Sequence, residues 1–128
     1  MNIDEYFAAL ERGLRHNLQS GRIEEPLVCI ASDDHNGLIR CRIVFWDDSY
    51  LDLYETVSTE LGFPVRIHYA YTYLRSRKRV FRYDNAPHHP EIATHPHHKH
   101  IGPTERLTPA DQPTLSQVLS EIDGWLGR

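Results

Sequence analysis

The sequence predicts an α+β fold, in which an antiparallel meander sheet of about five strands is flanked by an N-terminal and a C-terminal helix. Apolar residues recur at helical spacing near both ends of the chain, and apolar and polar residues alternate along much of the segment between them. Turn-forming residues separate the alternating runs. The 128 residues fit one domain with its own hydrophobic core, so we expect a single domain over residues 1–128.

The two helices are predicted from apolar faces. The first covers residues 4–19, with acidic residues at its start, Arg15 near its end and Gly21 as a stop signal. Its apolar face consists of Tyr6, Phe7, Leu10, Leu14 and Leu18. The second lies within residues 114–128, and both Thr108-Pro109 and Thr114 are suitable starts. Its apolar face consists of Leu115, Val118, Leu119, Ile122, Trp125 and Leu126.

Three strands are predicted in the first half of the chain. Two β-rich runs within residues 27–46 flank Asn36-Gly37, and Asn-Gly is the strongest short signal for a β-hairpin. With Asn36-Gly37 as a two-residue turn, Ile30 faces Ile43. Asp47-Asp48-Ser49 then forms a turn into a third strand over residues 50–57.

A second hairpin is predicted over residues 65–84, with a basic turn at residues 75–78. Centring it on Ser76 pairs aromatic residues across the strands, Tyr71 with Phe81 and Tyr69 with Tyr83. The same register places His68 opposite Asp84, with Arg66 and Arg82 nearby on that face. One face of this hairpin is then aromatic core, and the other carries a histidine, an aspartate and two arginines. Residues 83–104 are predicted to form a His-rich functional loop without regular structure.

The His-rich loop contains six imidazoles within residues 88–100. Neutral histidine is a common ligand of zinc, copper and nickel, which makes a metal-dependent hydrolase one hypothesis. The histidine spacing matches no familiar zinc pattern, and no cysteine lies nearby. We therefore predict no metal ligands and no cofactor.

Metal-independent phosphodiester cleavage is the preferred hypothesis. Histidine exchanges protons near neutral pH, arginine and lysine hold phosphate, and tyrosine stacks on unpaired bases. An aspartate beside a histidine orients its ring. The predicted catalytic residues are His68, Asp84, His97, His98 and His100. The predicted substrate-binding residues are Arg66, Tyr69, Tyr71, Arg82, Tyr83, Asn85, His88, His89 and Lys99.

The charge distribution favours an anionic partner. Residues 1–62 carry five basic and twelve acidic side chains, whereas residues 63–103 carry seven basic and two acidic side chains and seven of the nine histidines. A basic half on a protein of net charge −4 points to RNA or another nucleic acid. The start of the chain lacks the features of a secretory signal, and no apolar run approaches the ~20 residues that span a bilayer. We expect a cytoplasmic protein that does not contact a membrane.

The chain resembles the TumE-like family of bacterial toxin–antitoxin proteins. The resemblance lies in the strand His68-Tyr69-Ala70-Tyr71, the run Arg82-Tyr83-Asp84-Asn85 with Pro87-His88-His89, and the run Pro96-His97-His98-Lys99-His100. It implies a toxin component that is neutralised by a cognate antitoxin, a helix-turn-helix DNA-binding protein. It transfers no catalytic role to any residue.

These observations together predict a toxin that acts on RNA or another nucleic acid, with a ribonuclease as the preferred activity. They leave open whether the protein is catalytic at all. A non-catalytic module that binds nucleic acid or protein through its basic half is the first alternative, and the metal-dependent hydrolase is the second. A small meander sheet has two exposed edges, which favours a homodimer formed strand to strand.

Overall fold

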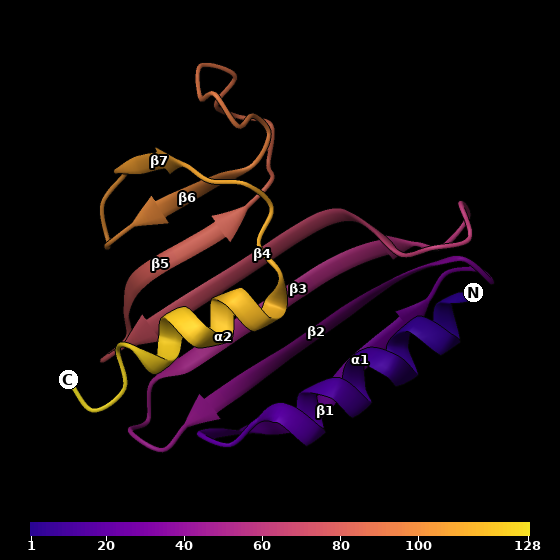
Figure 1. Cartoon of the computed structure of the whole chain (residues 1–128), viewed down its shortest axis with the longest axis horizontal. Coiled ribbons are helices and arrows are strands. Elements are labelled where there is room, and N and C mark those ends of the chain that lie inside the picture. Colours follow the sequence, from indigo (N-terminus) through magenta and orange to yellow (C-terminus); the bar gives the residue numbers. More distant parts are fainter.

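One antiparallel sheet of seven strands forms the centre of the computed structural model, which describes residues 1–128 (Figure 1). The strands lie side by side in chain order, each hydrogen-bonded to the next. Helix α1 (Ile3–Asn17) precedes the sheet and helix α2 (Leu115–Asp123) follows it. The strands are β1 (Gly21–Ala31), β2 (Asn36–Phe45), β3 (Tyr50–Ser58), β4 (Val65–Arg75), β5 (Lys78–Asp84), β6 (His98–Ile101) and β7 (Leu107–Pro109). Neither helix has the length and apolar character needed to cross a membrane.

The α+β class, the antiparallel sheet and both helices are confirmed. Helix α1 begins after Asn2, whose side chain accepts a hydrogen bond from the backbone N–H of Glu5 at 2.8 Å. Helix α2 begins after Thr114, which forms a capping box with Gln117. Thr114 is therefore the correct one of the two predicted starts, because its side chain satisfies an N–H group of the first helical turn.

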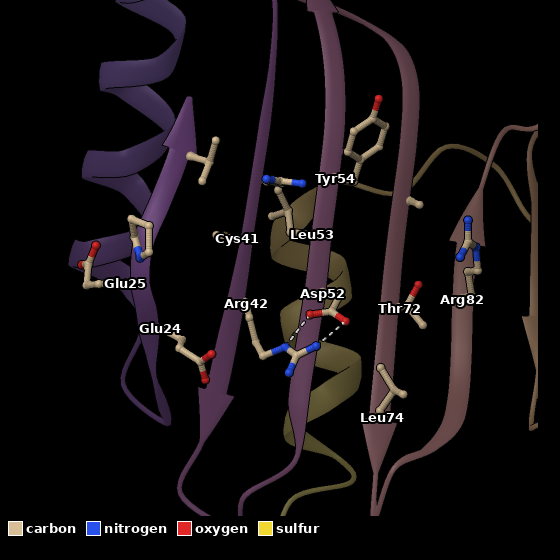
Figure 2. A pocket seen from close by; sticks show the side chains of 14 residues that line it. Glu24, Glu25, Cys41, Arg42, Asp52, Leu53, Tyr54, Thr72, Leu74 and Arg82 are labelled. Atoms are coloured by element: carbon tan, nitrogen blue, oxygen red, sulfur yellow. Dashed lines mark hydrogen bonds and ion pairs between the residues drawn. The ribbon is translucent and has the colours of Figure 1, made fainter. Parts of the chain in front are cut away.

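Both helices pack on the same face of the sheet. They lie in front of the strands in Figure 1 and behind them in Figure 2. The hydrophobic core fills the space between, and its strand residues share one face because side chains alternate along a strand. They include Ile39, Cys41, Ile43, Leu53, Tyr71, Tyr73 and Phe81. Because the chain has only these two helices, the opposite face of the sheet carries no helix, and we call it the open face.

The sheet has seven strands rather than about five, because the predicted His-rich loop supplies β6 and part of the path to β7. Prolines flank β6 at Pro96 and Pro103 without interrupting it. Strand β7 ends at Pro109 on the sheet edge, where a residue without an N–H group is tolerated. The many histidine and proline residues obscure the pattern of a strand in this segment. The short strand β6 nevertheless forms, because its backbone pairs with β5.

The first hairpin has a different register from the predicted one. Ile30 lies opposite Leu38, and Ala31 opposite Gly37, so the turn is longer than Asn36-Gly37. The carboxylate of Asp33 accepts hydrogen bonds from the backbone N–H groups of His35 and Asn36, both at 2.8 Å. These bonds stabilise a longer loop in place of a two-residue turn.

Gly37 lies where the sheet meets helix α1, and Gly37→Ala is expected to lower the free energy of unfolding by about 1–3 kcal/mol. A Cβ atom there would lie 2.6 Å from the carbonyl oxygen of Ile30 and 2.8 Å from Cζ of Phe7. Urea unfolding measures the loss. Gly13→Ala is the matched control, because a Cβ at Gly13 meets nothing within 4 Å and alanine favours the helix. Equal stability of both variants would contradict the close approach at Gly37.

Between Ala70 and Asp84 the second hairpin keeps the predicted faces, but its predicted pairs are wrong by two residues. Tyr71 lies opposite Tyr83, and Ala70 opposite Asp84. The turn is tighter than predicted, with Arg75 opposite Lys78, and an irregularity in the register follows it. A shift of two preserves the alternation of side chains, which is why the faces survive. His68 therefore lies beyond the last pair of β4 and β5 and is not opposite Asp84. On its other side it lies opposite Thr56 of β3.

Candidate functional site

Strands β5 and β6 bring one aspartate and two histidines together on the open face. Asp84 lies opposite His98, and Arg82 lies opposite His100. Nε2 of His98 is 2.9 Å from Oδ1 of Asp84, and Nε2 of His100 is 3.2 Å from Oδ2. We call Asp84, His98 and His100 the Asp84 cluster. Its members come from three positions that antiparallel pairing and side-chain alternation place on one face.

Asp84 is the centre of this cluster, and its side chain is only 6% exposed. Besides the two imidazoles, Nε of Arg82 donates to Oδ2 at 3.0 Å, and the backbone N–H of Ala86 donates to Oδ1 at 3.0 Å. A buried carboxylate is stable only with such partners. The donors hold the carboxylate in one orientation, so it orients both histidine rings.

The two histidines differ in their surroundings. The ring of His98 is almost fully buried, and its Nδ1 lies 2.9 Å from the carbonyl oxygen of Pro96. The ring of His100 is 13% exposed, and its buried Nδ1 has no hydrogen-bond partner. Burial lowers the pKa of His100, against the opposing effect of the Asp84 charge. A neutral His100 that donates from Nε2 to Asp84 keeps a free lone pair on Nδ1.

His89 packs edge-on against both rings from the segment between β5 and β6. Its ring centroid is 5.3 Å from that of His98 and 6.2 Å from that of His100. Its side chain is 30% exposed, and its Nδ1 lies 3.4 Å from Oε1 of Glu91. His89 is thus the most accessible imidazole beside the Asp84 cluster.

The open face is hollowed next to the cluster. Figure 2 shows this hollow, which has a volume of about 630 Å³ and extends across strands β1 to β5. Arg40, Arg42 and Arg82 contribute basic groups, and Arg42 forms an ion pair with Asp52 at 2.8 Å. Arg82 lines the hollow and also contacts Asp84, so the cluster lies at the β5 side of the hollow.

A second group of polar residues lies on the helix side of the sheet. Buried Glu55 accepts hydrogen bonds from the hydroxyl groups of Tyr6 in α1 and Tyr71 in β4. Nη1 of Arg66 donates to the Tyr71 hydroxyl at 2.7 Å. Arg66 reaches this side because β4 contains an extra residue at Ile67, which reverses the alternation. The expectation that Arg66 shares a face with Arg82 is therefore wrong.

Other predicted site residues also lie on the helix side. The ring of His97 stacks on Tyr69, with its Nδ1 2.9 Å from the Tyr69 hydroxyl. Nζ of Lys99 is 2.7 Å from Oε2 of Glu121 in α2, and the hydroxyl of Tyr83 donates to the same carboxylate at 2.6 Å. The Lys99 and Tyr83 contacts join the sheet to α2, on the face opposite the Asp84 cluster.

The remaining predicted residues lie near the end of β5. The side chain of Asn85 bridges two backbone groups of β4, accepting from Tyr69 N–H at 3.0 Å and donating to the Ile67 carbonyl at 2.9 Å. His68 is exposed, and no hydrogen bond joins its side chain to the cluster. His88 follows β5 in the exposed segment that carries His89.

The family comparison agrees with the resemblance in the sequence motifs. The family model described as Toxin TumE matches residues 22–126, which include the whole Asp84 cluster. The chain belongs to the TumE toxin family. Membership makes this TumE-family protein a toxin component and implies an antitoxin partner. No curated protein and no solved structure matches the chain significantly.

Sequence reasoning missed two residues of the TumE-family toxin that line the hollow, Arg40 and Arg42. A signal for them was present, because they alternate with the apolar residues Ile39, Cys41 and Ile43. Period-2 alternation places the two arginines on the face opposite the core. Arg40 and Arg42 lie on β2, in the acidic half of the chain. A count of charges therefore favours residues 63–103 and does not indicate this strand.

Proposed function

We propose that this TumE-family toxin cleaves RNA without a metal ion, using the Asp84 cluster as its catalytic centre. One observation carries the proposal: a buried carboxylate holds two imidazoles and a guanidinium at the border of a hollow. Arg40, Arg42 and Arg82 line this hollow together with the acidic residues Glu24, Glu25 and Asp52. A carboxylate–imidazole pair is a common device for general acid–base catalysis. The guanidinium supplies charge for a phosphate.

RNA is the substrate that this chemistry fits best, because it carries its own nucleophile. The 2′-hydroxyl attacks the adjacent phosphorus, the bond to the 5′-oxygen breaks, and the products are a 2′,3′-cyclic phosphate and a 5′-hydroxyl. A base removes the 2′-hydroxyl proton, and an acid gives a proton to the leaving 5′-oxygen. No metal-activated water is needed in this step.

His100 is proposed as the base. Asp84 accepts from its Nε2, which leaves Nδ1 to take the proton. His89 packs against the ring of His100, so RNA binding has to displace the His89 segment to reach Nδ1. His89, with its exposed ring, is proposed as the acid. Arg82, whose Nε contacts Asp84, is proposed to hold the phosphate through its terminal amino groups.

RNA is proposed to lie along the open face. Arg40 is exposed there, and Arg82 lies at the other side of the hollow beside the cluster. Tyr54 is 39% exposed on the same face and offers a ring on which an unpaired base can stack. The hollow thus provides charge, an aromatic surface and a route to Asp84.

The test is incubation of purified toxin with a single-stranded oligoribonucleotide in the presence of a strong chelator. We expect cleavage to continue and to leave 2′,3′-cyclic phosphate ends, and the matched oligodeoxyribonucleotide to remain intact. Binding of the RNA without cleavage would overturn the catalytic proposal in favour of a binding module. Cleavage of both oligonucleotides would overturn the role of the 2′-hydroxyl.

Arg40→Ala is expected to weaken RNA binding by a similar factor for every sequence and to reduce the salt slope by about 1, as for one lost phosphate contact. Binding is measured by fluorescence anisotropy over a range of salt concentrations. Arg12→Ala is the matched control, because Arg12 is an exposed residue on α1, on the helix side of the sheet. Equal losses in both variants would indicate that only net charge matters and would contradict the path along the open face.

A further inference from the structure

The contacts of the His98 ring indicate which of its two nitrogen atoms carries a proton. Nδ1 of His98 lies 2.9 Å from the Pro96 carbonyl oxygen, which can only accept, so Nδ1 carries a proton. In a neutral ring, Nε2 then holds a lone pair, and it faces Oδ1 of Asp84 at 2.9 Å. Two acceptors at that distance repel unless a positive charge lies between them. A cation shared between Nε2 of His98 and Asp84 removes this repulsion.

The donor set fits a transition-metal ion. One ligand atom from each member of the Asp84 cluster lies within 4.8 Å of the other two. Two imidazoles and one carboxylate suit zinc and its neighbours, and three protein ligands leave a coordination position open. The nitrogen–oxygen separations are 2.9 Å to Oδ1 and 3.2 Å to Oδ2 of Asp84, and both are below the ~4.2 Å maximum for two ligands about 2.1 Å from one metal.

The surroundings also match those of known metal sites. A metal-binding histidine commonly donates its second ring N–H to a backbone carbonyl, as His98 does to Pro96. Arg82 and the backbone of Ala86 hold the carboxylate, which fixes the third ligand. Asp84 and His98 are 4% and 3% exposed, so the ligands are pre-positioned and shielded from water.

We infer that Asp84, His98 and His100 bind one Zn²⁺ ion and that this ion inhibits the toxin. Zinc on Nε2 of His100 displaces the bond from Nε2–H to Asp84, and the ring proton moves to Nδ1. The atom that accepts the 2′-hydroxyl proton is then blocked. The inhibitory part rests on the proposed function, whereas the binding part rests only on the ligand geometry.

Metal binding is tested on untagged, chelator-treated full-length protein by calorimetric titration with Zn²⁺, and by the visible absorption of bound Co²⁺. We expect one ion per chain, and at least about 100-fold weaker binding in His100→Ala and Asp84→Asn. His16→Ala is the control, because His16 is exposed at the end of α1. Circular dichroism shows whether each variant is folded, and His98→Gln provides a second ligand variant. Binding that is equally tight in folded ligand variants would overturn the site.

The inhibitory part is tested by RNA cleavage at increasing Zn²⁺ concentration. We expect activity to fall in proportion to the occupancy measured by calorimetry and to return when a chelator is added. Bound zinc with unchanged cleavage would overturn inhibition and leave the binding site established. Cleavage that requires zinc would overturn both inhibition and the metal-independent mechanism. Absence of cleavage under every condition would overturn the proposed function together with inhibition, while the titration still decides the metal site.

Discussion

His100→Ala is expected to abolish growth inhibition by the toxin and to slow RNA cleavage by a factor of about 10²–10⁴. The proposed base disappears in this variant, while Asp84 keeps its bonds from Arg82 and Ala86 and its 2.9 Å contact with His98. The ring of His100 is partly exposed and lies on the open face, outside the core between the sheet and the helices. The fold is therefore expected to survive, and the loss to be chemical.

The measurement combines growth after induced expression with initial cleavage rates of the purified protein. His16→Ala is the control for the loss of an imidazole, because His16 lies at the end of α1 and far along the chain from the cluster. RNA affinity separates chemistry from binding, and we expect it to change little in His100→Ala. Full toxicity of a folded His100→Ala protein would rule out His100 as the base.

The secondary structure was predictable where one periodicity extends over a whole element. Both helices and the strands up to Asp84, apart from residues 21–26 of β1, follow from apolar spacing, because each buries one face against the core. Strand β6 was not predictable in this way. Its four residues contain two histidines and one lysine, and its stability depends on hydrogen bonds to the edge of β5, a long-range contact.

The candidate site was predicted in part, and partly for the wrong reason. Asp84, His98, His100 and Arg82 were selected from residue types and do lie together. The expected link to His68 depended on a hairpin register that differs by two residues. The actual link is the pairing of β5 with β6, which a sequence read as an irregular loop could not supply. The extra residue at Ile67 likewise leaves no trace in the alternation of residue types.

The tyrosines show how tertiary packing decides between two roles for one residue type. Tyr69 and Tyr71 were predicted to bind substrate because tyrosine stacks on bases. Both are almost fully buried on the helix side. Their hydroxyl groups instead bond to His97 and Glu55. Only burial, which the sequence does not report, separates a core tyrosine from an exposed one such as Tyr54.

Glu55→Ala is expected to lower the free energy of unfolding by about 1–3 kcal/mol for each of the two buried phenol donors that it leaves without an acceptor. Glu55 is 2% exposed and accepts hydrogen bonds from Tyr6 of α1 and Tyr71 of β4. Burial and the neighbouring carboxylate raise the pKa of both tyrosines far above the ordinary value, so both remain donors. Without Glu55, two phenol groups lose their acceptor, and the Tyr71 hydroxyl that accepts from Arg66 loses the bond that orients it.

Urea denaturation measures this loss, and Glu105→Ala is the matched control because Glu105 is exposed near β7. The control is expected to change stability by less than about 0.5 kcal/mol. Glu55 faces the helices, whereas Asp84 faces the open side. The stability of this variant therefore tests only the polar residues on the helix side. If Glu55→Ala were as stable as the control, the bonds from Tyr6 and Tyr71 would not join α1 to the sheet.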